Sequence, residues 1–149
     1  MNTVRSSPFS NIPPVVKNLL IINIIFFLAT AIFESKGLSL IEVLGVYYFD
    51  SPKFQVWQLV TYMFMHGGFA HILFNMFALF TFGSSLELIM GSKRFLNFYL
   101  ITGLGALALQ MLVQALEIYG ITGNVTIDPD TYRSANAGAI KTLSEIYYG

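Results

Sequence analysis

The chain has 149 residues, of which 55% are hydrophobic and 11% are charged, and its mean hydropathy is +0.65. Eight Lys and Arg balance eight Asp and Glu, so the chain lacks the excess of cations that nucleic-acid binding requires. The apolar content excludes an intrinsically disordered chain. Since there is no cysteine, disulfides, thiolate metal sites and a cysteine nucleophile are excluded as well. These exclusions leave a membrane protein, and the length favours a single domain.

The first apolar segment is NLLIINIIFFLATAIF, residues 18–33, with Lys17 before it and Glu34 after it. It is slightly shorter than the roughly 20 residues that cross a bilayer. Two valines before Lys17 lengthen it, and the lysine can place its ammonium group among the headgroups. We predict a membrane span over about residues 15–34. A cleaved signal peptide is the competing interpretation, but the run exceeds the usual core of such peptides and no small-x-small site follows it directly.

A second uncharged stretch covers residues 54–86, which is too long for one helix. Gly67 and Gly68 divide it into a loop half and a helix half. The second span is therefore predicted over residues 69–90, and Gly91 marks its end.

A third uncharged run follows the basic pair Lys93 and Arg94 and predicts a span over residues 95–117. The basic pair occupies a very short loop, and Arg5 and Lys17 precede the first span. These four residues share one side if the three spans alternate. We predict that this side, with the N-terminus, is cytoplasmic. The other side carries as many basic residues, but they are diluted over longer segments.

Two longer segments lie outside the predicted spans. Residues 35–68 contain Trp57 and several other aromatic residues, which favour the membrane interface. Apolar residues in this loop indicate short helices that either lie in the headgroup plane or fold against the spans. Residues 118–149 turn polar and predict an exposed loop, followed by a short helix from about residue 139 to 147.

Three polar residues within HGGFAHILFN are candidates for chemistry: His66, His71 and Asn75. His71 and Asn75 are four residues apart and share a helix face near the start of the second span. Polar side chains inside a membrane protein are functional candidates, although they also serve as hydrogen-bonding contacts between helices. A metal site is disfavoured, because the H-x4-H spacing lacks the acid of H-E-x-x-H and no other imidazole or thiolate completes a ligand set.

The stretch from Trp57 to Gly91 resembles the core of the rhomboid intramembrane serine proteases. Their signature is W-[RQ]-x-x-[ST]-x-x-[FL]-x-H-x4-H-x3-N, followed by G-x3-E-x3-G. The matching positions are Trp57, Gln58, Thr61, His66, His71, Asn75, Gly83, Glu87 and Gly91. With the third span included, the resemblance covers roughly residues 15 to 116.

This resemblance implies an all-α, six-helix membrane bundle, of which this chain holds three helices and the large loop between the first two. A serine on the fourth helix and a histidine on the sixth would cleave single-span membrane proteins as a catalytic dyad, without a metal or organic cofactor. The resemblance implies that His66 and Asn75 donate hydrogen bonds to the oxyanion and that His71 supports them. Trp57, Gly83, Glu87 and Gly91 would have structural roles.

The family motif G-x-S-G does not occur in the 149 residues. Its nearest likeness, residues 135–140, would place Ala137 at the serine position, but the segment from Lys141 onward is too polar to continue into a bilayer. We interpret the chain, residues 1–149, as the amino-terminal part of one rhomboid domain and predict that it is inactive alone. The alternative is a catalytically inactive rhomboid-like protein that binds membrane clients.

Overall fold

The computed structural model describes residues 12–127 and 137–148, and within these residues the regular structure is entirely helical. Three of the described helical segments are long and apolar enough to cross a membrane: Pro14–Glu34, Phe69–Met90 and Ser92–Thr122. This result confirms the predicted all-α, polytopic membrane fold. The chain divides into two structural units, Met1–Ile41 with Phe64–Ile101 and Glu42–Met63 with Thr102–Gly149.

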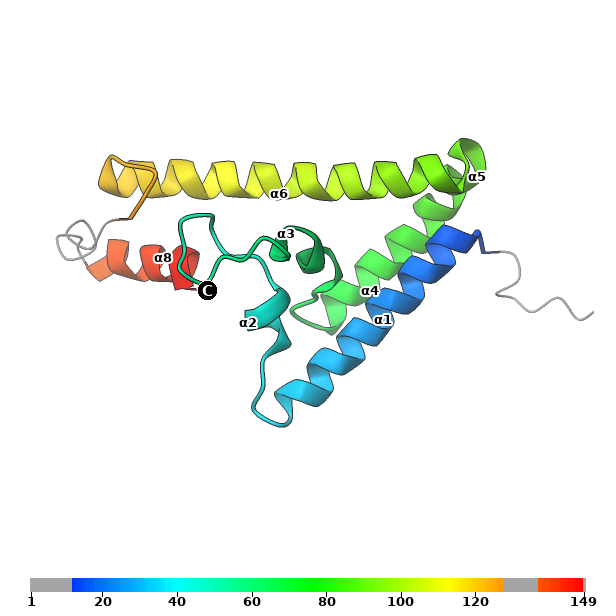
Figure 1. Cartoon of the computed structure of the whole chain (residues 1–149), viewed down its shortest axis with the longest axis horizontal. Coiled ribbons are helices and arrows are strands. Elements are labelled where there is room, and N and C mark those ends of the chain that lie inside the picture. Colours follow the sequence, from blue (N-terminus) through cyan, green and yellow to red (C-terminus); the bar gives the residue numbers. More distant parts are fainter. Residues whose placement is uncertain (1–11, 128–136, 149) are drawn as a thin grey trace, which may run out of the picture. The chain divides into compact units, whose positions relative to one another are not determined.

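The first unit pairs the first two spans. Helix α1 (Pro14–Glu34) starts with proline, whose fixed φ suits the first turn of a helix. The second span is one helical rod built from α4 (Phe69–Ala78), the π-helical turn η3 (Leu79–Gly83) and α5 (Ser84–Met90). The rod lies beside α1 and runs in the opposite direction (Figure 1). The bounds of both spans agree with the prediction.

Close packing in this unit depends on Gly83. A Cβ atom added there would lie 3.0 Å from Leu79 Cδ1 and 3.3 Å from both Phe95 Cζ and Val16 Cγ2. A small residue therefore lets α1 approach the second span. The buried core of the unit, formed by Val16, Leu19 and Phe95, lies around this contact.

Helix α6 (Ser92–Thr122) is longer than predicted at both ends. Lys93 and Arg94, expected in a short loop, lie in its first turn, and its end was expected near residue 117. Gly120 lies inside the helix rather than at its end. The helix stops at Gly123, whose φ of 74° belongs to the left-handed region that glycine adopts without strain.

The second unit contains most of the loop between the first two spans. The loop contains three short helices among its described residues: α2 (Leu40–Leu44), α3 (Gln58–Thr61) and, directly after α3, η2 (Tyr62–Phe64). Short helices in this loop were predicted from its apolar cluster. Their position relative to the headgroups stays a prediction.

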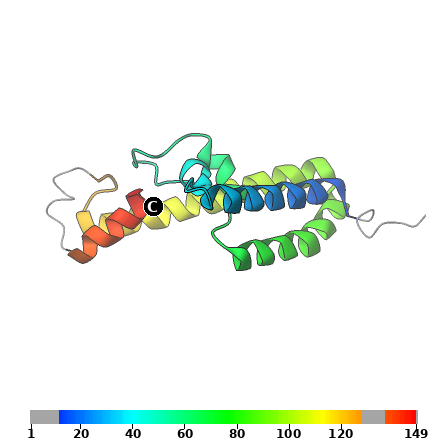
Figure 2. The same ribbon diagram turned by 90° about the horizontal axis from the view of Figure 1, so that it is seen from below.

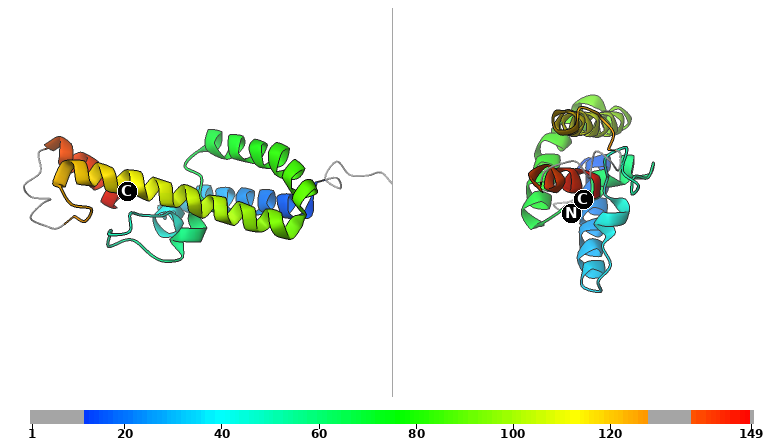
Figure 3. Two further views of the ribbon diagram at one scale, coloured as in Figure 1. Left: turned by 90° about the horizontal axis from the view of Figure 1, so that it is seen from above. Right: turned by 90° about the vertical axis from the view of Figure 1, so that its left-hand side faces the viewer.

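The short helix predicted from about residue 139 to 147 is present, and it packs against the end of the third span. Helix α8 (Ala137–Tyr148) lies beside the end of α6 (Figures 2 and 3). Leu143 and Ile146 from α8 pack with Ile118 from α6 and with Tyr48 from the loop. Leu143 and Ile118 are fully buried, so the apolar face of α8 is covered, which its polar composition did not reveal. The predicted loop at residues 128–136 lies outside the described residues.

Candidate functional site

The polar cluster lies where the chain enters the second span. Gly67 and Gly68 join His66 to the first turn of α4, and no heavy atom lies within 4 Å of a Cβ built on either glycine. The loop backbone is therefore open on the side where a side chain would project. This open side of the loop directly follows His66.

His66 is buried, with 4% of its surface exposed. Its Nδ1 lies 3.2 Å from the backbone carbonyl oxygen of Phe64. A carbonyl oxygen only accepts, so Nδ1 carries the proton and donates it. Burial lowers the pKa of His66, and the neighbouring His71 adds to this effect, while the Phe64 carbonyl opposes it. The ring is neutral at pH 7, and its Nε2 is an acceptor.

His71 and Asn75 occupy one face of α4, one helical turn apart, and both side chains are exposed. The ring of His71 lies edge-on to that of His66, with 5.1 Å between the ring centroids. The structure thus brings the two histidines together, and it places the exposed amide of Asn75 on the same helix face as the exposed imidazole. The groups able to donate a hydrogen bond outward are the side chains of His71 and Asn75.

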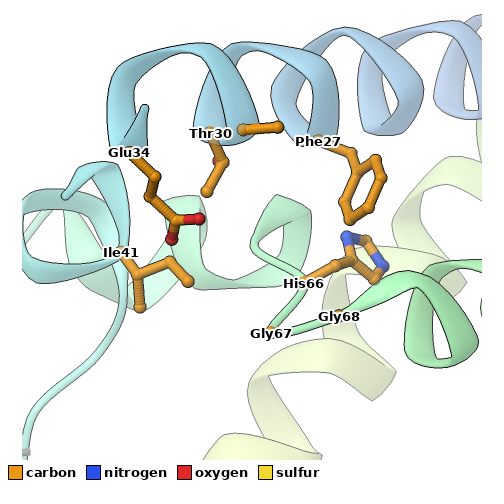
Figure 4. Close-up of a pocket in the computed structure, with 8 residues that line it drawn as sticks. Phe27, Thr30, Glu34, Ile41, His66, Gly67 and Gly68 are labelled. Atoms are coloured by element: carbon orange, nitrogen blue, oxygen red, sulfur yellow. The ribbon is translucent and has the colours of Figure 1, made fainter. Parts of the chain in front are cut away.

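A hollow of about 150 Å³ adjoins His66. Phe27, Thr30 and Glu34 line it from the end of α1, and His66, Gly67 and Gly68 line it from the loop. The side chains of Thr30 and Glu34 point from α1 toward the loop, and the ring of Phe27 lies next to that of His66 (Figure 4). Sequence reasoning missed this hollow, because Glu34 reads only as the charge that ends a span.

Glu87 joins the two spans at their other end. Its carboxylate is buried and accepts hydrogen bonds from Val15 N (3.0 Å), Val16 N (2.8 Å) and Ser92 Oγ (2.7 Å). The two amides belong to the first turn of α1, where backbone N–H groups have no partner within the helix. A carboxylate also interacts favourably with the positive end of the helix dipole. Gly91 ends α5 with a φ of 81°, which brings Ser92 back to the carboxylate.

The loop residues of the motif hold the loop together. Trp57 Nε1 donates to the carbonyl of Val43 at 3.2 Å, and Thr61 Oγ1 donates to that of Leu44 at 2.6 Å. Gln58 is 1% exposed, and its side-chain oxygen accepts a hydrogen bond from Gln55 N at 3.0 Å. These contacts give Trp57, Gln58 and Thr61 structural roles in the second unit.

In the part of the chain that the structure describes, His, Cys, Asp and Glu form no group of three able to hold a metal ion. The cluster of two histidines and one asparagine offers hydrogen-bonding side chains. Together with the three candidate spans, it defines a multi-pass helical membrane protein with a polar site at the start of one span.

Comparison with known proteins agrees with this class. A family model described as a Rhomboid domain matches residues 53–126. The chain is 34% identical over 92 residues to the putative rhomboid protease YdcA of Bacillus subtilis, an alignment covering 61% of this chain and 39% of that protein. It is 40% identical over 67 residues to Rhomboid-like protein 15 of Arabidopsis thaliana, an alignment covering 45% of this chain and 17% of that protein. It is 44% identical over 48 residues to the rhomboid protease GluP of Bacillus subtilis, an alignment covering 32% of this chain and 10% of that protein.

The chain belongs to the rhomboid family. The matches to YdcA, Rhomboid-like protein 15 and GluP span less than two fifths of each relative's own length. No solved structure matches the chain.

Proposed function

We propose that this chain carries the oxyanion-binding part of a rhomboid-type intramembrane serine endopeptidase that cleaves single-span membrane proteins. The observation that carries the proposal is the shared, exposed face of His71 and Asn75 next to the buried His66. Side-chain N–H groups fixed at one place stabilise the negative charge that develops on a scissile carbonyl. A partly dehydrated site near a membrane strengthens them.

The geometry favours different roles for the two histidines from those that the resemblance implies. The resemblance implied that His66 donates to the oxyanion with Asn75, and that His71 supports them. His66 already donates its Nδ1 proton to Phe64, and its neutral Nε2 has no proton to give. We therefore propose that His71 and Asn75 are the donors and that His66 is a positioning residue acting through its ring contact with His71.

The nucleophile is the second part of the proposal. Since G-x-S-G does not occur in these 149 residues, we propose that the serine and its partner histidine come from sequence outside them. A Ser–His pair needs a contact of about 2.6–3.2 Å, which requires both groups to be present in the folded bundle.

The proposal is tested by comparing two membrane preparations with a single-span substrate and a serine-directed phosphonate. One contains residues 1–149, and the other contains the product of the complete reading frame around them. We expect the complete product to cleave the substrate and bind the phosphonate, and residues 1–149 to do neither. Robust cleavage by residues 1–149 would contradict the assignment of the nucleophile. Client binding without labelling or cleavage by the complete product would instead support the inactive, client-binding alternative.

A further inference from the structure

The hollow between the end of α1 and the loop at His66–Gly68 has a lining with a definite hydrogen-bonding character. The hydroxyl of Thr30, which is 4% exposed, donates its hydrogen to the Phe26 carbonyl at 2.8 Å. His66 likewise donates its Nδ1 hydrogen to the Phe64 carbonyl. The Thr30 oxygen and His66 Nε2 therefore remain as acceptors, and the carboxylate of Glu34 only accepts. The polar side chains of this hollow thus accept hydrogen bonds and have no proton left to donate.

The electrostatics of the hollow have one sign. Glu34 supplies a negative charge, and no Lys or Arg lines the cavity. Glu34 is also the last residue of α1, whose final turn has no basic side chain to offset the negative end of the helix dipole. Phe27 also lines the hollow, and the face of an aromatic ring attracts cations. A group that is positively charged and rich in N–H donors matches this lining.

We propose that this hollow binds the ammonium or guanidinium group of a lysine or arginine side chain of a transmembrane substrate, close to the bond to be cleaved. The inference rests on the proposed function, because it names a feature of the substrate. His66 lines the hollow and also contacts His71, so the bound cation would lie beside the proposed oxyanion donors. Glu34 would then be a specificity-determining residue.

The lining favours a protein side chain over a lipid headgroup. A phosphatidylethanolamine headgroup carries an ammonium and a phosphate together, and no cationic side chain lines the hollow to pair with the phosphate. Lysine and arginine are also less frequent on the extracytoplasmic side of membrane proteins. With the orientation predicted here, a site for them on that side would discriminate among substrates.

The test measures binding rather than cleavage. The protein is reconstituted in phosphatidylcholine nanodiscs, because the choline group lacks N–H donors. The dissociation constants of three single-span peptides are compared, which carry Lys, Gln or Glu at one position just outside the apolar segment. Wild-type protein is expected to bind the Lys peptide about threefold to fivefold more tightly than the Gln peptide, as for one partly exposed ion pair. Glu34→Gln should remove this preference, and Glu34→Lys should turn it toward the Glu peptide.

Glu117→Gln is the matched control, because it removes an exposed carboxylate of α6 that does not line the hollow. It should keep the preference for the Lys peptide. Persistence of the preference in Glu34→Gln would overturn the inference, whether or not any peptide is cleaved. The inference would also be overturned if added phosphatidylethanolamine removed the preference for the Lys peptide by competing for a site that depends on Glu34. The hollow would then hold a lipid ammonium group. Absence of cleavage with the Glu34-dependent preference intact would count against the proposed function alone.

Discussion

The buried, neutral imidazole of His66 makes the fold sensitive to acid. Burial lowers the pKa of His66 below its ordinary value of 6.5. At pH values between the lowered pKa of the folded chain and 6.5, the unfolded chain binds a proton on His66 that the folded chain does not bind. The free energy of unfolding therefore increases with pH in this window. The contribution of neutral His66 is fully present above pH 6.5 and is lost as the pH falls through the lowered pKa.

This pH dependence is measured by thermal unfolding in detergent at pH 7.5, 6.5 and 5.5. The wild-type Tm is expected to fall as the pH decreases through this range. In His66→Gln the fall should be smaller, because the amide has no proton to take up, whereas His71 remains in both proteins. Identical dependence of Tm on pH in wild type and His66→Gln would show that protonation of His66 does not lower the stability of the fold.

Residue type and spacing predicted much of the candidate site. The interval of four between His71 and Asn75 was enough to place them on one helix face. The division of roles proposed for His66 and His71 rests on the carbonyl of Phe64 and on burial, both of which arise from tertiary packing and leave no pattern in the sequence. Glu34 gave no signal either, since a charge after an apolar run is common at the end of a span.

At the scale of helices, Glu87 links α1 to the second span by hydrogen bonds. Its carboxylate accepts hydrogen bonds from two backbone N–H groups of α1 and from the hydroxyl of Ser92. Hydrogen bonds to a charged group are worth about 1.5–3 kcal/mol each, and a buried donor that loses its partner costs a similar amount. Removing the charge should therefore loosen the contact between the two spans.

Glu87→Gln is expected to lower the free energy of unfolding by about 2 kcal/mol, because the amide offers one acceptor oxygen in place of two. Glu87→Ala should lower it further. The measurement is thermal or denaturant unfolding in detergent. Glu145→Gln is the control, since Glu145 forms an exposed pair with Lys141 at 3.9 Å and its loss should leave stability nearly unchanged. Equal Tm values for wild type and Glu87→Gln would remove this account of Glu87.

Helix ends were predictable where the chain carries its own stop signals. Pro14 begins α1, and Gly91 separates the second span from α6. The end of α6 was missed because the chain turns polar from residue 118, whereas the helix continues through Gly120 to Thr122. The burial of Leu143 against Ile118 was missed as well, because it depends on contacts between residues far apart in sequence.

At the scale of the molecule, three alternating spans predict that the N-terminus and the basic pair Lys93 and Arg94, in the first turn of α6, lie on the cytoplasmic side. The chain has no cysteine, so single cysteines can be introduced without a background. Lys93→Cys is expected to react with a membrane-impermeant maleimide only after cells are opened. Lys36→Cys, in the exposed turn after α1, should react in intact cells. The reverse pattern would invert the orientation.

The most direct test of the proposed oxyanion site measures kcat and KM of the complete protein with single alanine substitutions. Asn75→Ala and His71→Ala should each reduce kcat by about 100-fold to 1,000-fold with little change in KM, because each removes a donor used mainly in the transition state. His66→Ala should reduce kcat less and should also lower Tm, as expected for a positioning residue. Wild-type kcat in both Asn75→Ala and His71→Ala would contradict the assignment of the oxyanion site to this face of α4.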